Sequence, residues 1–350
     1  MTTRKPSLLI TGGAGFIGST LVRQCLAEGD SLVVNLDKFT YAGHRSSLEE
    51  VENHPDYVLV EGDIVDAKLV GEVLEEHRPW AIVHLAAETH VDRSIVDPPT
   101  FAVTNVLGTC TLLDVATRYW QQLDVAGRAR FRFLYVSTDE VFGSAGPEQA
   151  FDEQSPVSPN SPYAASKAAG EQLTGAFAHT YGLPTLVANP SNHYGPRQHP
   201  EKLIPKMILH AAAGEPLGVY GDGLHQRDWL HVEDGCRVLR AILRQGLSGE
   251  RYLVGADNCQ VNLAVVETIC DLVDELLADN GQRRKLIAHV TDRLGHDRRY
   301  AVCANKVRET TGWQPTVSFS VGLRETVAWY LQHRQWVEKM WATEVDTEVD

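Results

Sequence analysis

The chain has 350 residues, a formal net charge of −14 at pH 7 and six cysteines. A single core stops growing at roughly 250 to 300 residues, so this length predicts a large lobe and a smaller second lobe. The negative charge argues against general binding to nucleic acid or anionic membrane. The sequence shows no CxxC pair, no signal peptide and no apolar segment near the roughly 20 residues that span a bilayer, which predicts a soluble cytoplasmic protein.

Short apolar runs alternate with helical stretches through the first half of the chain. This alternation predicts an α/β fold with a Rossmann-type, doubly wound parallel sheet, which gathers ligands at the carboxyl ends of its strands. The expected strands are SLLIT at 7–11, SLVVNLD at 31–37, YVLVEGD at 57–63, AIVHLAA at 81–87 and FRFLYVST at 131–138.

Proline and glycine punctuation after Pro184 indicates a change of architecture. We expect a dinucleotide-binding domain over residues 1–188, completed by about residues 225–250. A smaller, partly interleaved C-terminal lobe should then span residues 189–224 and 251–335. Residues 336–350 form a tail, in which the repeat TEVDTEVD is typical of a solvated terminus.

A glycine-rich turn lies between the first expected strand and the first expected helix. In LLITGGAGFIGSTLV, Gly12 permits the tight turn, Gly15 lets a pyrophosphate approach the backbone, and Gly18 lets the helix pack closely on the sheet. Asp37 ends the next strand, at the separation typical of an acid that binds the adenine ribose. The motif predicts a bound dinucleotide, and the carboxylate favours NAD over NADP. An unoccupied turn is the alternative.

A second motif lies on the helix expected from Pro162 to Gly182. Ser161 can cap this helix, and Tyr163 and Lys167 stand four residues apart, so they share one face. A lysine beside a tyrosine stabilises the phenolate, which brings the phenol pKa from near 10 toward the range for removing a proton from an alcohol. A plain amphipathic helix with an exposed lysine is the alternative reading.

Taken together, these motifs resemble the extended short-chain dehydrogenase/reductase family, and within it the branch that dehydrates nucleotide sugars. In that family the tyrosine is the base, the lysine holds ribose, and a serine or threonine such as Thr138 assists. The resemblance covers nearly the whole chain, in the phrases NLDKFTYAG, LAAETHVDRSI, STDEVFG, SPYAASK, SNHYGPRQHPEKLIP, VYGDGLHQRDW and DRLGHDRRYA.

The resemblance implies a set of binding residues for each ligand. The cofactor residues would be Gly12, Gly15, Phe16, Ile17, Gly18, Asp37, Lys38, Thr40, Asp63, Ile64, Leu85, Ala86, Ala87, Thr104, Tyr163 and Lys167. The residues around the sugar and the nucleotide diphosphate would be Thr89, Thr138, Asn192, Lys202, Leu203, Arg227, Asn262, Arg293 and His296. Arginine forks suit phosphate, although either arginine could instead form an ordinary surface ion pair.

The adjacent acids Asp139 and Glu140 follow a buried strand, and the resemblance assigns them a reaction. Tyr163 would remove the proton from the C4 hydroxyl of a nucleoside-diphosphate glucose, with dTDP-glucose the expected substrate, while hydride passes to tightly bound NAD. Glu140 would then take the C5 proton and protonated Asp139 would release the C6 hydroxyl as water, before hydride returns to C6. A desolvated pocket can hold two carboxyls in different protonation states. Solvated loop acids are the alternative.

Other functions remain open at this stage. A nucleotide-sugar epimerase or decarboxylase would use the same tyrosine and lysine without both acids, a dehydratase could act on UDP-glucose, and a non-catalytic NAD-binding regulator could share the fold. The histidines show no HExxH or similar spacing, so no metal is expected. Relatives commonly form homodimers through long helices such as 101–121 and 162–181. The usual pattern is not kept at Thr89, His193, Arg197, His199, His225, Gln226 and His231, mostly in the second lobe.

Overall fold

A seven-stranded parallel sheet dominates the computed structural model, which describes residues 5–279 and 281–347. The strand order is β10-β6-β5-β4-β1-β2-β3. The chain moves outward from β1 to β3, returns to the other side of β1 and continues outward, so the order reverses between β1 and β4, as in a doubly wound fold. The expected fold class is confirmed. The strands are β1 (Ser7–Thr11), β2 (Leu32–Asp37), β3 (Tyr57–Glu61), β4 (Pro79–His84), β5 (Arg132–Val136), β6 (Thr185–Pro190) and β10 (Arg251–Val254).

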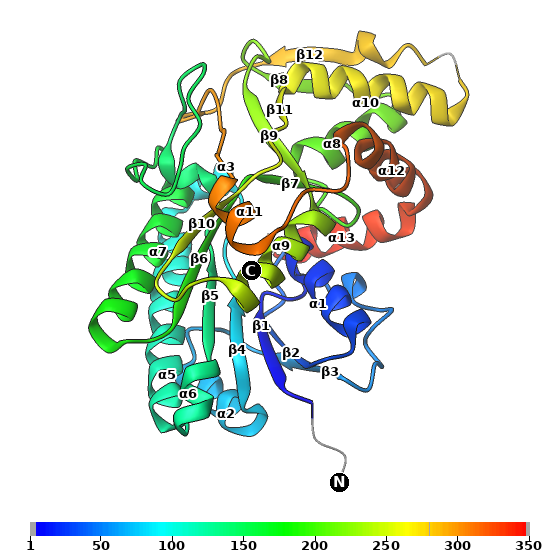
Figure 1. The fold of residues 1–350 in the computed structure, drawn as a ribbon. Coiled ribbons are helices and arrows are strands. Elements are labelled where there is room, and N and C mark those ends of the chain that lie inside the picture. Colours follow the sequence, from blue (N-terminus) through cyan, green and yellow to red (C-terminus); the bar gives the residue numbers. More distant parts are fainter. Residues whose placement is uncertain (1–4, 280, 348–350) are drawn as a thin grey trace.

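Helices cover both faces of this sheet, because neighbouring strand residues point to opposite sides (Figure 1). Leu8 and Ile10 pack in one cluster with α1 (Phe16–Glu28), α9 (Val232–Gln245) and α11 (Asn305–Thr311). Leu9, between them, packs in a second cluster on the opposite face. That face is covered by α2 (Ala67–His77), α5 (Thr109–Gln122) and α7 (Pro162–Tyr181), and the short helix α6 (Val125–Arg130) lies against α5.

The smaller lobe lies beyond the carboxyl ends of the large sheet, at the top of Figure 1. It has a core of its own around Met207, Trp229 and Ile269. Its two small sheets are β11-β9-β7 and β12-β8, from β7 (Asn192–Tyr194), β8 (Leu217–Tyr220), β9 (Gln226–His231), β11 (Cys259–Val261) and β12 (Ile287–Val290). Its helices are α8 (Leu203–Ala213), α10 (Asn262–Leu277), α12 (Phe319–Gln332) and α13 (Arg334–Thr347), with the 3₁₀-helix η4 (Arg283–Leu286).

The chain crosses between the lobes more than once, as expected for interleaved lobes, and the expected residue boundaries other than the one at residue 251 stay a prediction. One boundary needs correction: β10 pairs in parallel with β6, so residues 251–254 belong to the large sheet. The expected tail is also helical as far as Thr347, because α13 starts at Arg334 and packs on the smaller core through Trp336 and Met340. Residues 348–350 of the repeat lie outside the described residues.

One helix corrects the expectation that no segment is long and apolar enough to span a membrane. Residues 98–122 form a continuous helix of 25 residues, and an 18-residue window of it has a mean hydropathy of 1.2. It comprises α4 (Pro98–Phe101), a π-helix η2 (Ala102–Gly108) and α5, and it follows α3 (Val91–Val96). Its apolar stretch is 56% buried inside the protein, because α5 packs against α2 and α7 and contributes to the core of the large lobe.

Candidate active site

The glycine turn adopts the geometry that the sequence predicts. Gly12 has a φ of 72°, and a Cβ there would lie 2.6 Å from the Ala86 nitrogen. A Cβ at Gly18 would lie 2.1 Å from the Gly12 carbonyl oxygen, so α1 can begin this close to the turn only with glycine. Gly15 is different, because a Cβ there would meet nothing nearer than 3.4 Å. Its backbone faces more open space at the helix N-terminus, which suits an approaching phosphate.

Asp37 ties this turn to the end of β2. One carboxylate oxygen accepts a hydrogen bond from the Ala14 nitrogen at 2.8 Å, and the other accepts one from the Phe39 nitrogen at 2.9 Å. Burial raises the pKa of Asp37, while these backbone donors act to lower it. Beside it, the Lys38 ammonium pairs with Asp63 at 3.2 Å, which lies just beyond β3. Lys38 is therefore already engaged by a carboxylate, a setting that does not favour an additional phosphate.

The other expected cofactor residues lie along the carboxyl ends of β1 to β4. Phe16 and Ile17 start α1, Thr40 follows β2, Ile64 follows β3 and the run Leu85–Ala87 follows β4. Thr104 is buried on the π-helix η2, and π-helical turns often mark functional sites. Its neighbour Asn105 accepts a hydrogen bond from the Glu88 nitrogen at 2.9 Å and donates to Ser166 on α7 at 2.8 Å. This brace was not predicted.

Helix α7 carries the tyrosine and lysine, and its caps agree with the sequence. The Ser161 hydroxyl accepts a hydrogen bond from the Ala164 nitrogen at 3.1 Å, and Gly182 ends the helix with a φ of 75°. Lys167 is 4% exposed, and its ammonium donates to the Val136 carbonyl at 2.8 Å. Burial lowers the pKa of Lys167 to about 7, with the Glu171 carboxylate acting in the opposite direction.

The protonation of Tyr163 differs from the expectation. Its pKa is raised well above the usual value, first by burial and then by the charges of Glu140, Tyr135 and Asp139, while a hydrogen bond with Thr138 acts to lower it. The expected lowering by Lys167 is not the dominant effect, because desolvation and two nearby acids outweigh one ammonium that is bound to a backbone carbonyl.

The acid pair lies at the carboxyl end of β5, on the 3₁₀-helix η3 (Asp139–Phe142). Thr138 caps this turn, and its hydroxyl lies 3.3 Å from both the Glu140 nitrogen and an Asp139 oxygen. Asp139 is 1% exposed, and its second carboxylate oxygen has no hydrogen-bond partner among the described residues. Asp139 is therefore buried and Glu140 half-buried beside Tyr163, and neither is an ordinary surface acid.

The two acids have different electrostatic surroundings. Burial, the neighbouring Glu140 and Asp228 raise the pKa of Asp139 well above its usual value. Burial also raises the pKa of Glu140, but Arg293, Arg227 and Lys202 oppose that shift. The positive groups favour the charged form of Glu140, whereas Asp139 has two carboxylates as neighbours. The site can therefore hold a protonated Asp139 next to an ionised Glu140.

Three positive side chains from the smaller lobe lie near enough to Glu140 to oppose the rise of its pKa. Arg227 on β9 is 5% exposed and donates to the Asp297 carbonyl at 2.9 Å. Lys202, at the start of α8, donates to the Thr89 carbonyl at 3.0 Å across the two lobes. The guanidinium of Arg293 lies 3.8 Å from Asp92. Among the described residues, Asn192 at the start of β7 and Asn262 at the start of α10 each have a buried amide oxygen without a partner, and Leu203 begins α8.

Tyr300 and Asp297 belong to this network and were not predicted. The Tyr300 hydroxyl lies 2.8 Å from an Asp297 oxygen and 3.4 Å from a Glu140 oxygen. The Arg227 guanidinium packs over the Tyr300 ring at 4.2 Å from its centre. Both residues lie inside the quoted phrase DRLGHDRRYA. A buried tyrosine in a charged phrase was the available signal, but sequence spacing alone could not connect it to Glu140.

His296 lies in a polar group that the sequence did not indicate. Its imidazole donates to Asp292 at 2.7 Å and stacks on His225 with ring centres 3.7 Å apart at 15°. Burial lowers the pKa of His296 to about 4. These three residues bring possible metal-ligand atoms within 4.8 Å of one another. Imidazole nitrogens bind a metal in the plane of the ring, and two nearly parallel planes do not converge on one ion. The absence of a metal stays a prediction.

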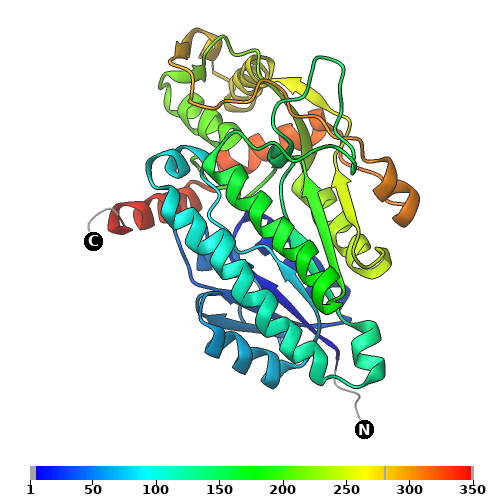
Figure 2. The same ribbon diagram turned by 90° about the vertical axis from the view of Figure 1, so that its left-hand side faces the viewer.

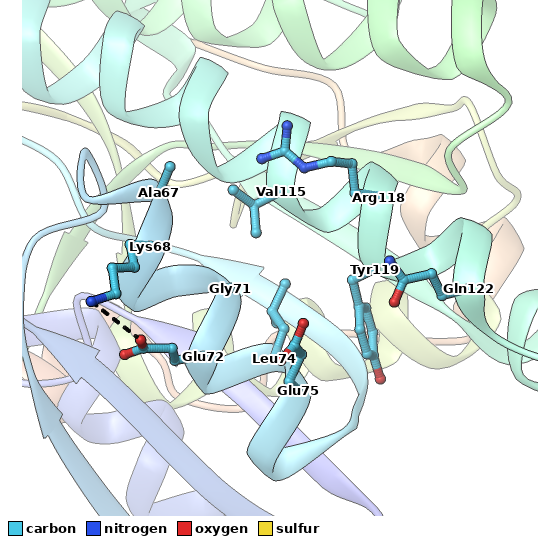
Figure 3. Close-up of a pocket in the computed structure, with 10 residues that line it drawn as sticks. All are labelled: Ala67, Lys68, Gly71, Glu72, Leu74, Glu75, Val115, Arg118, Tyr119 and Gln122. Carbon is cyan, nitrogen blue, oxygen red and sulfur yellow. Dashed lines mark ion pairs between the residues drawn. The ribbon is translucent and has the colours of Figure 1, made fainter.

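Two hollows on the large lobe lie apart from these residues. Figure 3 shows the first, a groove of 280 Å³ between α2 and α5, where Lys68 pairs with Glu72 at the rim. The second, of 460 Å³, lies beside α7 and β10 and is lined in part by Glu171 and Arg251. Neither is lined by a residue that the sequence analysis assigned to the cofactor or the substrate.

Comparison with known proteins agrees with this architecture. A family model described as GDP-mannose 4,6 dehydratase matches residues 9–326. The chain is 50% identical over 332 residues to a dTDP-glucose 4,6-dehydratase of Xanthomonas campestris pv. campestris strain B100, covering 94% of each chain. It is 46% identical over 342 residues to dTDP-glucose 4,6-dehydratase 1 of Escherichia coli K12, covering 95% of each.

A solved structure gives the same result in three dimensions. DesIV, a dTDP-glucose 4,6-dehydratase from Streptomyces venezuelae with NAD and TYD bound, superposes with a TM-score of 0.88 at 42% identity, covering 95% of this chain and 99% of that one. The resemblance to extended short-chain dehydrogenases/reductases is thereby confirmed. The chain belongs to the GDP-mannose 4,6 dehydratase family and, within it, to the dTDP-glucose 4,6-dehydratases.

Proposed function

We propose that this protein catalyses the NAD-dependent conversion of dTDP-glucose to the 4-keto-6-deoxy sugar nucleotide with loss of water. The observation that carries the proposal is the acid pair: Asp139 and Glu140 lie beside Tyr163, and although burial raises the pKa of both, three positive side chains oppose that shift at Glu140 while two carboxylates add to it at Asp139. Water elimination needs both an acid and a base, whereas oxidation at C4 alone needs only the tyrosine. The relatives at 46–50% identity carry the same activity in their names.

The first step is oxidation at C4 of the glucose. Tyr163, as the phenolate, removes the proton of the C4 hydroxyl. The Lys167 ammonium, four residues along α7, and the positive charge of bound NAD would oppose the burial that raises the pKa of this phenol. Thr138 hydrogen-bonds the phenol, and Lys167 positions the ribose of the cofactor. The glycine turn and Asp37 fit the pyrophosphate and ribose of NAD, because Gly15 leaves its backbone accessible and Asp37 presents two acceptor oxygens. Bound NAD supplies removal of hydride from C4 and its later return to C6, so it is regenerated in each turnover.

The second step is elimination of water across C5 and C6. The new C4 ketone makes the C5 hydrogen acidic, and ionised Glu140 removes it. Protonated Asp139 donates to the departing C6 hydroxyl, which leaves as water. Glu140 returns its proton to C5 when hydride reaches C6, and the proton that Tyr163 gained balances the one that Asp139 lost. The buried, unpartnered Asp139 oxygen suits a hydroxyl of the sugar.

The positive side chains of the smaller lobe would bind the diphosphate and the nucleoside. Arg227 and Arg293 supply locally the positive charge that a chain of net charge −14 lacks overall. Lys202 and His296 complete this side, and Asn192 and Asn262 offer buried amide oxygens to sugar or base donors. The thymine preference follows from the relatives. The stacked pair of His225 and His296 is the part of the site where this chain departs from the usual pattern.

A product assay with three nucleotide sugars tests the proposed function. Purified protein is incubated separately with dTDP-glucose, UDP-glucose and GDP-mannose, and the products are weighed by mass spectrometry. We expect a product lighter by one water from dTDP-glucose. An unchanged mass with an altered sugar would indicate an epimerase, preferential loss of water from UDP-glucose would reassign the nucleobase, and no turnover on any substrate would indicate a non-catalytic NAD-binding protein.

We also propose a cytoplasmic homodimer. Helices α5 and α7 run side by side across an outer face of the large lobe (Figure 2). Val103 and Leu107, on the π-helix that continues into α5, are 48% and 54% exposed, as expected for apolar residues that a partner would cover. All six cysteines are free thiols, which suits a reducing compartment. Light scattering after size exclusion should give twice the 38.7 kDa chain mass.

A further inference from the structure

We propose that Glu171 is a positioning residue of the active site, which holds Lys167 in its charged form and anchors the turn that carries Thr138. The inference rests on the proposed function, and nothing in the reaction above requires it. Glu171 does not lie among the residues that face the cofactor or the sugar. It lies one helical turn beyond Lys167 on α7, where side chains four residues apart share a face.

Hydrogen bonds connect Glu171 to the acid pair through β6. Glu171 is 3% exposed, and Asn189 on β6 is fully buried. The Asn189 amide donates to a Glu171 oxygen at 2.8 Å and to the Thr138 carbonyl at 3.1 Å. One amide therefore links the carboxylate to the backbone at which η3 begins. Thr138 is the cap of that turn, so a shift of Glu171 would move Asn189 and Thr138 and thereby the turn that carries Asp139 and Glu140.

The cost of burying Glu171 shows that its charge has a partner. Arg251 on β10 forms an ion pair with it, and a buried carboxylate persists only when it is paired and hydrogen-bonded. Arg251 and Glu171 both line the 460 Å³ hollow, which Lys306 and Glu250 also line. The Glu171 carboxylate on α7 is therefore held from two other elements, by the Asn189 amide on β6 and by Arg251 on β10, and a lone surface salt bridge would not need such an arrangement.

Among the groups around Lys167, Glu171 is the carboxylate that favours the charged form of the lysine. On α7, Tyr163 and Glu171 lie four residues to either side of Lys167 and share its face of the helix. From β5 the ring of Tyr135 lies 4.5 Å from its ammonium, and from β4 the buried His84 is affected by its charge. Burial lowers the pKa of Lys167 to about 7, and Glu171 alone among the acids acts to raise it. Loss of the Glu171 charge should therefore lower the lysine pKa further.

The direction of the effect on activity follows from the role of the lysine. The ammonium form is the one that binds ribose and stabilises the phenolate, so activity falls as pH rises through the lysine pKa. In Glu171→Gln this alkaline limb should move to lower pH by at least about one unit, because a charge roughly 6 Å away at an effective dielectric constant of about 20 is worth about 3 kcal/mol, or about two units, before screening by solvent and salt. With a lysine pKa falling from about 7 to about 6, turnover should fall about tenfold at pH about 8 and less than about twofold at pH about 6.

The test compares kcat for water loss from dTDP-glucose over a pH series in the NAD-loaded wild type, Glu171→Gln and Glu171→Asp. The matched control is Glu250→Gln, which makes the same chemical change in the same hollow at an acid paired with Lys306. We expect the alkaline limb to move only in Glu171→Gln and to return in Glu171→Asp, which restores the charge. Circular dichroism and thermal unfolding check that each variant is folded.

The outcomes separate this inference from the proposed function. An inactive wild type overturns the proposed function. An active wild type whose alkaline limb is unchanged in folded Glu171→Gln overturns the role of Glu171. A uniform loss of kcat at every pH, equal in the Gln and Asp variants, would show a packing role only and would also overturn it. The same shift in Glu250→Gln would show that any acid in the hollow has this effect.

Discussion

The cofactor side and the substrate side of this site are built in different ways. On the cofactor side, backbone groups and short side chains do most of the binding: the Gly12–Gly18 turn leaves room, and Asp37 is held by two backbone N–H groups from nearby elements. On the substrate side, long charged side chains meet from distant parts of the chain. Lys202 reaches Thr89 across 113 positions, and Tyr300 reaches Glu140 across 160.

This difference shows where each side is sensitive. The cofactor side depends on close backbone packing, so its weak points are positions where a Cβ does not fit or an acceptor is lost. The substrate side depends on the charge states of buried groups, so a substitution that adds or removes a single proton at one of them should impair it. Asp139 and Glu140 are adjacent in sequence and occupy one turn, yet their neighbours differ. Carboxylates raise the pKa of Asp139 further, whereas positive side chains oppose the rise at Glu140, which suits an acid at one position and a base at the other.

The largest expected effect is the loss of the base on α7. Tyr163→Phe removes the hydroxyl and leaves the ring, which packs against Phe101, so the protein should fold normally. General acid–base catalysis contributes roughly 10²–10⁴-fold, and we expect kcat to fall by that factor. Single-turnover oxidation, followed by the absorbance of reduced cofactor, checks it. Retention of the C4 oxidation rate in the folded variant would show that another group is the base.

The next effect separates elimination from oxidation. Asp139→Asn removes the acid that releases water, and we expect dehydration to fall on the order of 10²-fold while C4 oxidation continues, so that reduced cofactor accumulates. Glu140→Gln at the neighbouring position should also block elimination, and isotope exchange at C5 should stop in that variant. Water loss at the wild-type rate in Asp139→Asn would contradict the assigned role of acid.

A smaller effect is expected at the diphosphate. Arg227→Lys keeps the charge but loses the planar fork that packs over Tyr300 and donates to Asp297. We expect KM for dTDP-glucose to rise on the order of tenfold, with kcat within about threefold of wild type, because one charged hydrogen bond is worth roughly 1.5–3 kcal/mol. Steady-state kinetics checks this, and a fall in kcat at unchanged KM would place Arg227 at the reacting sugar instead.

The sequence predicts the cofactor side more completely than the substrate side for the same physical reason. The cofactor motif lies in one continuous segment: a strand, a glycine turn, a helix and an acid at the end of the next strand. Sequence spacing therefore predicts Gly12 and Asp37. The brace from Asn105 to Ser166, the link from Asn189 to Glu171 and the contact of Tyr300 with Glu140 join segments whose proximity only the fold decides. Likewise, the raised pKa of Tyr163 depends on burial among acids, which the Tyr163–Lys167 spacing alone does not reveal.

The final prediction compares the stability of the two sides through one substitution, Asp to Asn. Because the folded-state pKa of Asp139 is raised above its unfolded value, the folded protein binds more protons there, and stability falls as pH rises from about 4 toward the raised pKa. Asp139→Asn removes that penalty. At neutral pH the free energy of unfolding of Asp139→Asn should exceed that of the wild type by about 1 kcal/mol, so the variant is more stable. The difference should vanish below pH about 4.

Asp37→Asn should have the opposite sign, although burial raises the pKa of Asp37 too. Both Asp37 oxygens accept backbone hydrogen bonds, and an asparagine has only one acceptor, so the nitrogen of Ala14 or Phe39 loses its partner. An unpaired buried donor costs roughly 1–3 kcal/mol, and we expect a loss of about 1 kcal/mol after relief of the buried charge. Urea unfolding of both variants in the same buffer measures the pair. The second carboxylate oxygen has a hydrogen-bond partner at Asp37 and none at Asp139, and this difference is the reason for the opposite effects. If both substitutions changed the free energy of unfolding in the same direction, this explanation would be wrong.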